Sequence, residues 1–280
     1  MANEWRRAVR KLWKRNQRIL NTSSRKVVPY RVNLHWWSMN RADHVENIGD
    51  YLSKVICDYM LAQKGLDFDK PVTHTRHLYS VGSIIQGGAQ DATIWGSGLK
   101  KPLQGFDTTM RWYRKLDIRL VRGPKTREAL LKSGFSCPQA YGDPAIILPM
   151  IYQPGQEKCF DYTVVLHKDT NQQIENSIMP LGCDYKPFVD RLSSSRLVIS
   201  SSLHGIILAE TYGVPALLLS DTETENLFKY QDYYQSTGRP EFPIASSLEE
   251  ALQMEPLPVP DFTHIRNTII STFPYDLWED

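Results

Sequence analysis

Short apolar runs alternate with helical patterns along most of the chain. Residues 197–199 are consecutive and apolar, as in a parallel strand that is buried on both faces. Apolar residues then recur at near-helical spacing over residues 203–212, and a second apolar run fills residues 216–219. Gly213 stands where a glycine commonly ends a helix. This stretch predicts a βαβ unit of a parallel sheet.

The same alternation occurs in both halves of the chain. Further strands are predicted at residues 27–37, 78–82, 93–98, 117–121 and 162–166. Further helices are predicted at residues 51–64, 125–133, 188–195, 247–254 and 262–273. Pro149, Pro154 and Gly155 indicate a linker between the halves. We therefore expect an α/β protein with two Rossmann-like domains that face a cleft, over residues 26–152 and 153–280.

Composition narrows the class of protein. The chain has 280 residues, enough for one large or two medium domains, and its net charge of +2 is too balanced to predict nucleic-acid binding. No apolar run approaches membrane-spanning length, and no signal peptide is visible. The four cysteines are widely spaced without a CxxC pair, so we expect free thiols in a reducing cytoplasm and no metal site.

The first 25 residues form a basic leader. Residues 5–18 contain seven Lys or Arg and no acidic residue, and Val9, Leu12 and Trp13 share one face of a predicted amphipathic helix. Such a helix can lie on an anionic membrane surface. It can equally be a frayed helix whose tryptophan face packs on the protein, and the pattern leaves both interpretations open.

The turn after the strand at 197–199 is the first candidate for chemistry. Ser200, Ser201 and Ser202 precede Leu203 and His204 at a predicted helix start. Backbone N–H groups at a helix N-terminus beyond the carboxyl end of a strand favour anions. The alternative is a serine that caps the helix beside a solvated histidine.

Two other strand-to-helix turns carry polar residues. In the first, Gly49 allows close backbone approach by a ligand, and Asp50 is either the helix N-cap or a carboxylate for proton transfer. In the second, Arg122 follows a strand and precedes a helix, where a guanidinium can fork onto a carboxylate or phosphate. The alternative for Arg122 is a surface ion pair.

The second half adds candidate contacts to a substrate. His167 follows a predicted strand, as Arg122 does. Residues 227–239 are rich in polar and aromatic side chains that can line an acceptor groove. The candidates in this stretch are Lys229, Tyr230, Tyr233, Tyr234 and Arg239. Residue patterns alone predict an enzyme that handles an anionic small molecule.

The chain resembles the polysaccharide pyruvyltransferase family, most nearly the short xanthan-type ketal pyruvate transferases of exopolysaccharide synthesis. The resembling stretches run from about residue 35 to the C-terminus. They read NIGDYLSKVI (47–56), IWGSG (94–98), VRGPKTREAL (121–130), YGDPA (141–145), SSSLHGIILAETYGVPA (200–216), FKYQDYYQSTGR (228–239) and FPYDLW (273–278).

The resemblance implies a GT-B-like fold and transfer of a pyruvyl group from phosphoenolpyruvate to two hydroxyls of a sugar, without a cofactor. It assigns Arg122 and His204 to donor binding or catalysis. We add Ser200, Ser201, Ser202, Leu203 and Lys125 to the donor side. Some relatives carry an arginine where this chain has Ser202, and Lys125, Lys229 or Arg239 are candidates to replace that cation.

On the acceptor side we expect Asn47, Gly49, Asp50 and His167, together with the candidates in residues 227–239. Asp50 is the candidate base, and His204 the candidate acid. The expected acceptor is a lipid-linked oligosaccharide at the inner face of the cytoplasmic membrane. Two other classes stay open: a glycosyltransferase that uses a nucleotide sugar, and a non-catalytic scaffold of a membrane complex.

If the basic leader binds membrane, deleting residues 1–20 should abolish sedimentation of the protein with anionic liposomes, because the leader supplies both positive charge and an apolar face. Liposome sedimentation of the full and shortened chains measures this. Equal binding by the two chains, or binding by neither, contradicts membrane association through the leader.

Overall fold

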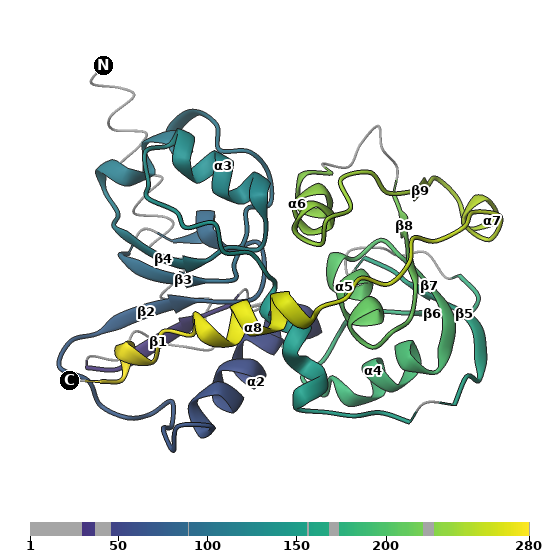
Figure 1. The fold of residues 1–280 in the computed structure, drawn as a ribbon, viewed down its shortest axis with the longest axis horizontal. Coiled ribbons are helices and arrows are strands. Elements are labelled where there is room, and N and C mark those ends of the chain that lie inside the picture. Colours follow the sequence, from purple (N-terminus) through teal and green to yellow (C-terminus); the bar gives the residue numbers. More distant parts are fainter. Residues whose placement is uncertain are drawn as a thin grey trace.

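The computed structural model describes residues 30–36, 46–88, 90–155, 157–167, 174–220 and 227–279. The basic leader lies outside these residues. Within them the chain folds into helices and two parallel sheets, which confirms the α/β class (Figure 1). No helix in these ranges is both long and apolar enough to cross a bilayer.

The first sheet holds four parallel strands in the order β1-β2-β3-β4. They are β1 (Val32–His35), β2 (Arg76–Tyr79), β3 (Ala92–Trp95) and β4 (Leu116–Leu120). The connecting helices include α2 (Ile48–Ala62) and α3 (Pro124–Lys132), and the 3-10 segments η1 (Ile85–Gly87) and η2 (Gly105–Trp112). Another 3-10 segment, η3 (Pro144–Met150), leads out of this half.

The second sheet holds five parallel strands in the order β6-β5-β7-β8-β9. They are β5 (Phe160–Val165), β6 (Ser177–Ile178), β7 (Ser195–Ser200), β8 (Ala216–Leu219) and β9 (Ile244–Ala245). The helices are α4 (Lys186–Ser193), α5 (Leu203–Thr211), α6 (Phe228–Ser236) and α7 (Leu248–Ala251). The predicted βαβ unit is confirmed as β7-α5-β8, and Gly213 after α5 has φ +78°, the left-handed conformation that ends a helix.

The C-terminal segment returns to the first sheet. It comprises α8 (Thr263–Ser271) and η4 (Tyr275–Leu277), and Figure 1 shows α8 running back from the second half toward β1 and β2. Trp95 of β3 donates its indole N–H to the Ile269 carbonyl at 3.1 Å, and its ring meets Phe273 edge to face. The division into domains at residues 152 and 153 stays a prediction. The C-terminal residues, which the prediction assigns to the domain 153–280, pack on the first sheet.

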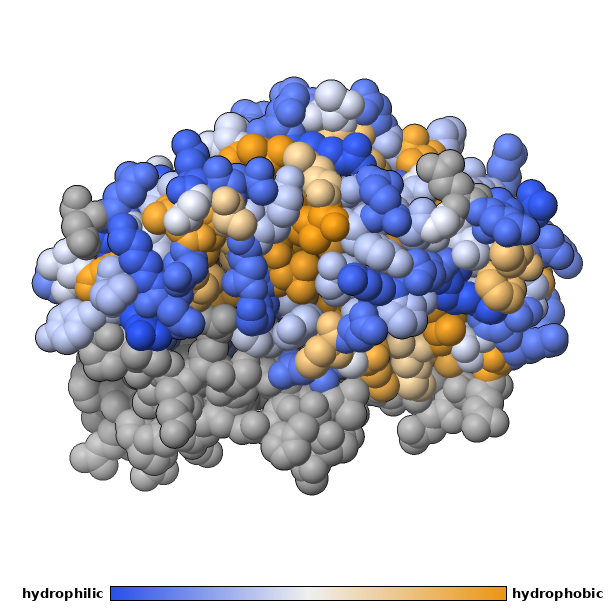
Figure 2. All heavy atoms as spheres, turned by 90° about the horizontal axis from the view of Figure 1, so that it is seen from below, coloured by the Kyte–Doolittle hydropathy of each residue, from blue (hydrophilic) through white to orange (hydrophobic). Residues whose placement is uncertain are grey.

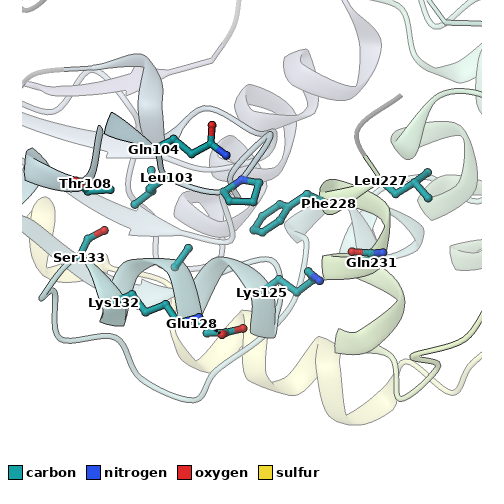
Figure 3. A pocket seen from close by; sticks show the side chains of 12 residues that line it. Leu103, Gln104, Thr108, Lys125, Glu128, Lys132, Ser133, Leu227, Phe228 and Gln231 are labelled. Atoms are coloured by element: carbon teal, nitrogen blue, oxygen red, sulfur yellow. Dashed lines mark hydrogen bonds and ion pairs between the residues drawn. The ribbon is translucent and has the colours of Figure 1, made fainter. Parts of the chain in front are cut away.

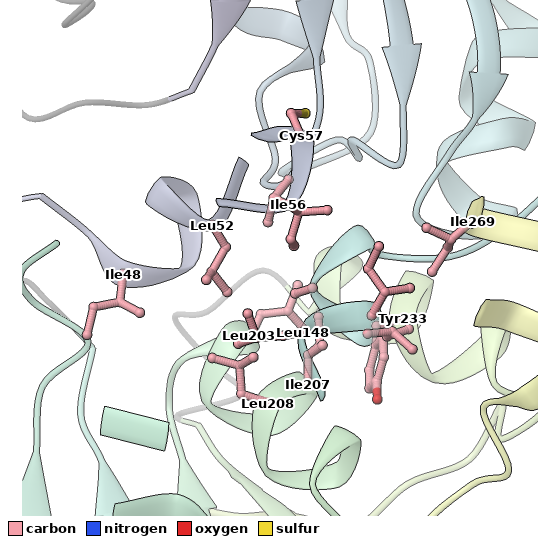
Figure 4. Packing of buried hydrophobic residues seen from close by; sticks show 14 of the residues in the cluster. Ile48, Leu52, Ile56, Cys57, Leu148, Leu203, Ile207, Leu208, Tyr233 and Ile269 are labelled. Atoms are coloured by element: carbon pink, nitrogen blue, oxygen red, sulfur yellow. The ribbon is translucent and has the colours of Figure 1, made fainter. Parts of the chain in front are cut away.

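One apolar cluster joins the two halves. Ile48, Leu52 and Ile56 of α2 point toward Leu148 of η3 and the apolar side of α5 (Figure 4). The described surface is mainly hydrophilic on the face in Figure 2, where apolar side chains emerge only in patches. Burial of apolar side chains from both halves in a common cluster stabilises their mutual arrangement.

Replacing Trp278 by alanine should lower the free energy of unfolding by about 3–5 kcal/mol, because this ring is fully buried against Phe68 and Phe273. Trp112→Ala is the matched control, since Trp112 is 80% exposed. Urea denaturation of both variants measures the difference. Equal losses of stability would contradict the packing of the C-terminal segment.

Candidate functional site

The turn between β7 and α5 is built by its own serines. The Ser200 hydroxyl accepts the Ser202 N–H at 3.0 Å and donates to the Ser202 carbonyl at 2.8 Å. The Ser201 hydroxyl accepts the backbone N–H of His167 at 2.8 Å. Ser200 and Ser201 therefore stabilise the turn and connect it to the end of β5. Their hydroxyls bind the protein backbone, which is a structural role and not the predicted contact with the donor.

Ser202 occupies the N-cap position of α5, yet its side chain makes no capping bond. Its backbone is extended, with φ −111° and ψ 130°, and its hydroxyl has no hydrogen-bond partner among the described residues. The serine-cap alternative is therefore wrong for Ser202. The N–H groups that open α5, beginning at Leu203, form an electropositive helix end that suits an anion.

His204 lies between the two halves of the molecule. Its Nε2 is 3.7 Å from Oδ2 of Asp143, and its side chain is only 12% exposed, so the predicted solvated histidine is wrong. The other edge of the ring faces α2, where a Cβ atom on Gly49 would lie 2.0 Å from Nδ1. The close approach that we expected for a ligand at Gly49 is made by the His204 ring.

Asp143 is the site residue that the sequence reasoning missed. Its Oδ1 accepts the Ala145 N–H at 3.0 Å and caps η3, while Oδ2 faces His204. Asp143 lies in the stretch YGDPA, which the resemblance marks without a role. The signal in the sequence is an acidic residue directly before a proline, which is also typical of an ordinary helix cap.

Asn47, not Asp50, caps α2. The Asn47 side chain accepts the Asp50 N–H at 3.2 Å, so the cap interpretation of Asp50 is wrong and the expected acceptor contact of Asn47 is replaced by a structural one. The half-buried Asp50 carboxylate lies against Gly82, where a Cβ atom would be 2.5 Å from Oδ1. Asp50 is thus next in the chain to the glycine that contacts His204.

Arg122 is buried rather than presented to a cleft. Its side chain is 1% exposed, and Nε contacts Oδ2 of Asp232 at 3.1 Å. The guanidinium also donates to the Ser83 hydroxyl at 2.6 Å and to the Leu99 carbonyl at 2.8 Å. The prediction of a surface ion pair is wrong, because the pair with Asp232 is buried. A donor substrate would have to compete with three protein acceptors for the Arg122 guanidinium.

Asp232 connects α6 to the start of α3. Its carboxylate accepts the backbone N–H of Thr126 at 2.8 Å and the Thr126 hydroxyl at 2.7 Å, in addition to Arg122. Gly123 permits this approach, since a Cβ atom there would lie 1.9 Å from the Asp232 carbonyl oxygen. A carboxylate from the second half therefore satisfies a helix N-terminus and a guanidinium of the first half.

Lys125 lines a cavity of about 570 Å³ between α3, the 102–108 segment and the start of α6 (Figure 3). Its ammonium nitrogen is 5.8 Å from the centroid of the Phe228 ring. His204, Asp50 and Arg122 do not line this cavity. The structure therefore places Lys125 apart from the other predicted donor contacts.

The tyrosines of α6 are buried and do not line a groove. Tyr230 donates to the Ser201 carbonyl at 2.9 Å, and Tyr233 donates to Oε2 of Glu210 at 2.5 Å. Burial, reinforced by the Glu210 carboxylate, raises the pKa of Tyr233 well above its usual value. These side chains hold α6 against the turn and α5, which corrects their predicted role as acceptor contacts.

The remaining predicted acceptor residues in the 227–239 stretch also contact protein groups. Arg239 forms a bidentate ion pair with Glu210, with both N–O distances 2.7 Å. Tyr234 is buried and stacks on Phe242 with ring centroids 4.1 Å apart. The Lys229 ammonium nitrogen is 4.6 Å from the centroid of the Tyr230 ring. Arg239 is thus structural and does not replace the missing cation.

The structure therefore brings His204, Gly49 and the opening of α5 together, with Asp143 behind the imidazole. Asp50 follows Gly49 in the chain, and its carboxylate lies against Gly82. His167 lies beside this group, half-buried after β5. An imidazole, a carboxylate and an electropositive helix end provide a proton donor, a proton acceptor and a place for an anion. The arrangement suits acid–base chemistry on an anionic substrate.

No protein-family model matches the chain. The succinoglycan biosynthesis protein ExoV of Rhizobium meliloti (strain 1021) is 27% identical over 226 residues, which are 74% of this chain and 67% of that protein. An uncharacterized protein of Acanthamoeba polyphaga mimivirus, L143, is 23% identical over 215 residues, 69% of this chain and 71% of its own. The first relative supports the resemblance to the polysaccharide pyruvyltransferase family.

A solved structure shares the fold. The crystal structure of a functionally uncharacterized protein from Klebsiella pneumoniae subsp. pneumoniae NTUH-K2044 matches with a TM-score of 0.51 at 15% sequence identity. The match covers 78% of this chain and 93% of that one. It supports the α/β architecture and carries no information about activity.

Replacing Asp232 by alanine should lower the free energy of unfolding by about 3–5 kcal/mol, because it leaves the buried Arg122 guanidinium and the Thr126 N–H unpaired. Glu128→Ala removes an exposed ion pair with Lys132 on the same helix and should leave the free energy nearly unchanged. Urea denaturation compares the two. Similar stabilities for both variants would refute the anchoring role of Asp232.

Proposed function

We propose that this protein transfers the pyruvyl group of phosphoenolpyruvate to two hydroxyls of a terminal hexose in a bacterial exopolysaccharide repeat unit. The product is a cyclic pyruvate ketal, and inorganic phosphate is released. The resemblance of the motifs supports this proposal, as does the likeness to a succinoglycan biosynthesis protein. A GT-B-like arrangement, xanthan-type specificity and a lipid-linked acceptor at the cytoplasmic membrane belong to the same proposal.

The observation that carries the proposal is the position of His204. It stands in the first turn of α5, beside N–H groups that its N-cap residue leaves uncapped, and it approaches Gly49 of the other half. An anionic group of phosphoenolpyruvate at the helix end would lie next to the imidazole. Proton transfer and anion binding would then occur at one point between the halves.

The chemistry requires two proton movements and one leaving group. A proton adds to the methylene carbon of phosphoenolpyruvate, and the first sugar hydroxyl attacks the adjacent carbon as its own proton leaves. Phosphate departs with the electron pair of the broken C–O bond and takes up the proton of the first hydroxyl. The second hydroxyl then closes the ring on the same carbon, and its proton restores the acid that protonated the methylene carbon. His204 serves as the acid, and Asp50 accepts a hydroxyl proton.

Cations for the donor are fewer than the resemblance predicts. Arg122 is engaged with Asp232, Ser83 and Leu99, so we assign it to holding the Gly82–Ser83 turn beside Asp50 and not to direct contact with the donor. The N–H groups of α5 and the Ser202 hydroxyl supply neutral donors in its place. The alternative function is a glycosyltransferase that uses a nucleotide sugar, which the two parallel sheets accommodate equally well.

Phosphoenolpyruvate at about 100 times its dissociation constant should stabilise the native protein by roughly 2.7 kcal/mol, because it binds the folded state alone. His204→Gln should weaken that stabilisation and abolish phosphate release in the presence of an oligosaccharide acceptor. Thermal-shift titration and a phosphate assay measure the two effects. Stabilisation by a nucleotide sugar but not by phosphoenolpyruvate would favour the glycosyltransferase.

A matched pair of glycine variants sharpens this experiment. A Cβ atom on Gly49 must displace the His204 ring, so Gly49→Ala should lower kcat/KM about 10²-fold. Gly155→Ala adds the same methyl group where no atom lies within 4 Å and should leave kcat/KM unchanged. Equal activity of the two variants would show that the position of His204 does not limit the reaction.

A further inference from the structure

Asp143 has two carboxylate oxygens with different partners. Oδ1 caps η3 by accepting the Ala145 N–H at 3.0 Å. Oδ2 is buried without a hydrogen bond and lies 3.7 Å from Nε2 of His204, which is buried and unpartnered as well. Two orphaned polar atoms that face each other in the interior indicate a functional pairing, because each alone is costly to bury.

The geometry also separates the two nitrogens of the imidazole. Nε2 is turned inward to Asp143, whereas Nδ1 is on the edge that faces Gly49 and the start of α2. Since Nε2 is shielded, only Nδ1 remains to exchange a proton with a ligand. A carboxylate oxygen accepts hydrogen bonds, so a neutral His204 beside ionised Asp143 carries its proton on Nε2.

We propose that Asp143 is the positioning residue of His204. It keeps the proton of the neutral imidazole on Nε2, orients the ring across Gly49, and stabilises the imidazolium that forms when Nδ1 takes up a proton. The catalytic consequence rests on the proposed function, whereas the effect on the imidazole does not. Asp143 itself touches no reacting atom.

Asp143→Asn tests this role without removing the helix cap. The amide oxygen of asparagine can still accept the Ala145 N–H, while its NH₂ group faces Nε2 and donates to it. The neutral ring should then carry its proton on Nδ1. Two-bond ¹⁵N–¹H correlation spectra of the full chain at about pH 8.5, above the usual imidazole range, distinguish the two tautomers. His204→Gln identifies the resonance.

The variant should also lower kcat by at least about 10²-fold while KM for phosphoenolpyruvate stays within about twofold, because a wrong tautomer impairs proton transfer more than binding. Asp143→Ser is the second variant, since serine also caps helices but brings no charge toward His204. It should reduce kcat similarly. Urea denaturation of both variants checks that the cap survives.

The outcomes separate this proposal from the proposed function. A changed tautomer in Asp143→Asn supports the positioning role even if the wild type transfers no pyruvyl group, in which case the proposed function alone fails. An unchanged tautomer in Asp143→Asn, or an unchanged kcat in both folded variants, overturns the positioning role and leaves Asp143 as a cap of η3.

Discussion

The position of α6 beside the candidate site depends on the buried ion pair between Asp232 and Arg122. The Asp232 carboxylate satisfies the Arg122 guanidinium and the first turn of α3, so α6 is fixed to the first half of the chain. Through Tyr230 the same helix contacts the carbonyl of Ser201 in the serine turn. A burial of charge that is costly in isolation is compensated here by several hydrogen bonds.

Tyr233 of α6 and Arg239, just after this helix, extend the connection to α5. Tyr233 and Arg239 both bind the buried carboxylate of Glu210, which lies on α5 after His204. The position of His204 is therefore set from two directions, by the serine turn at the helix start and by Glu210 further along. Residues that look like sugar contacts in the sequence bind the serine turn and α5 instead.

Local patterns were sufficient for much of the fold. The apolar run at 197–199 and the spacing over 203–212 predict β7 and α5 because both elements are defined by short-range periodicity. Helix α2 begins at Ile48, three residues before the predicted start at residue 51, because its cap is Asn47, which the sequence analysis assigns to the acceptor side. The aromatic residues of α6 predict a groove that binds the acceptor, but they are buried. Their partners, Ser201 and Glu210, are distant in the sequence, so the local pattern does not show this burial.

Some residues of the candidate site could be predicted from local sequence patterns, and others could not. His204 and Gly49 stand out locally, as a histidine and a glycine that are each at a helix start, and the fold brings them into contact. Asp143 and Asp232 have no local signature, since their partners lie 61 and 110 positions away in the chain. Tertiary charge pairing of this kind leaves no period in a sequence.

The contact between His204 and Gly49 also constrains how the halves work together. Nε2 faces Asp143 and Nδ1 faces α2, so the imidazole occupies the junction between η3, α5 and α2. The shared apolar cluster holds α2 against α5, so packing away from the imidazole is a condition of the contact between His204 and Gly49.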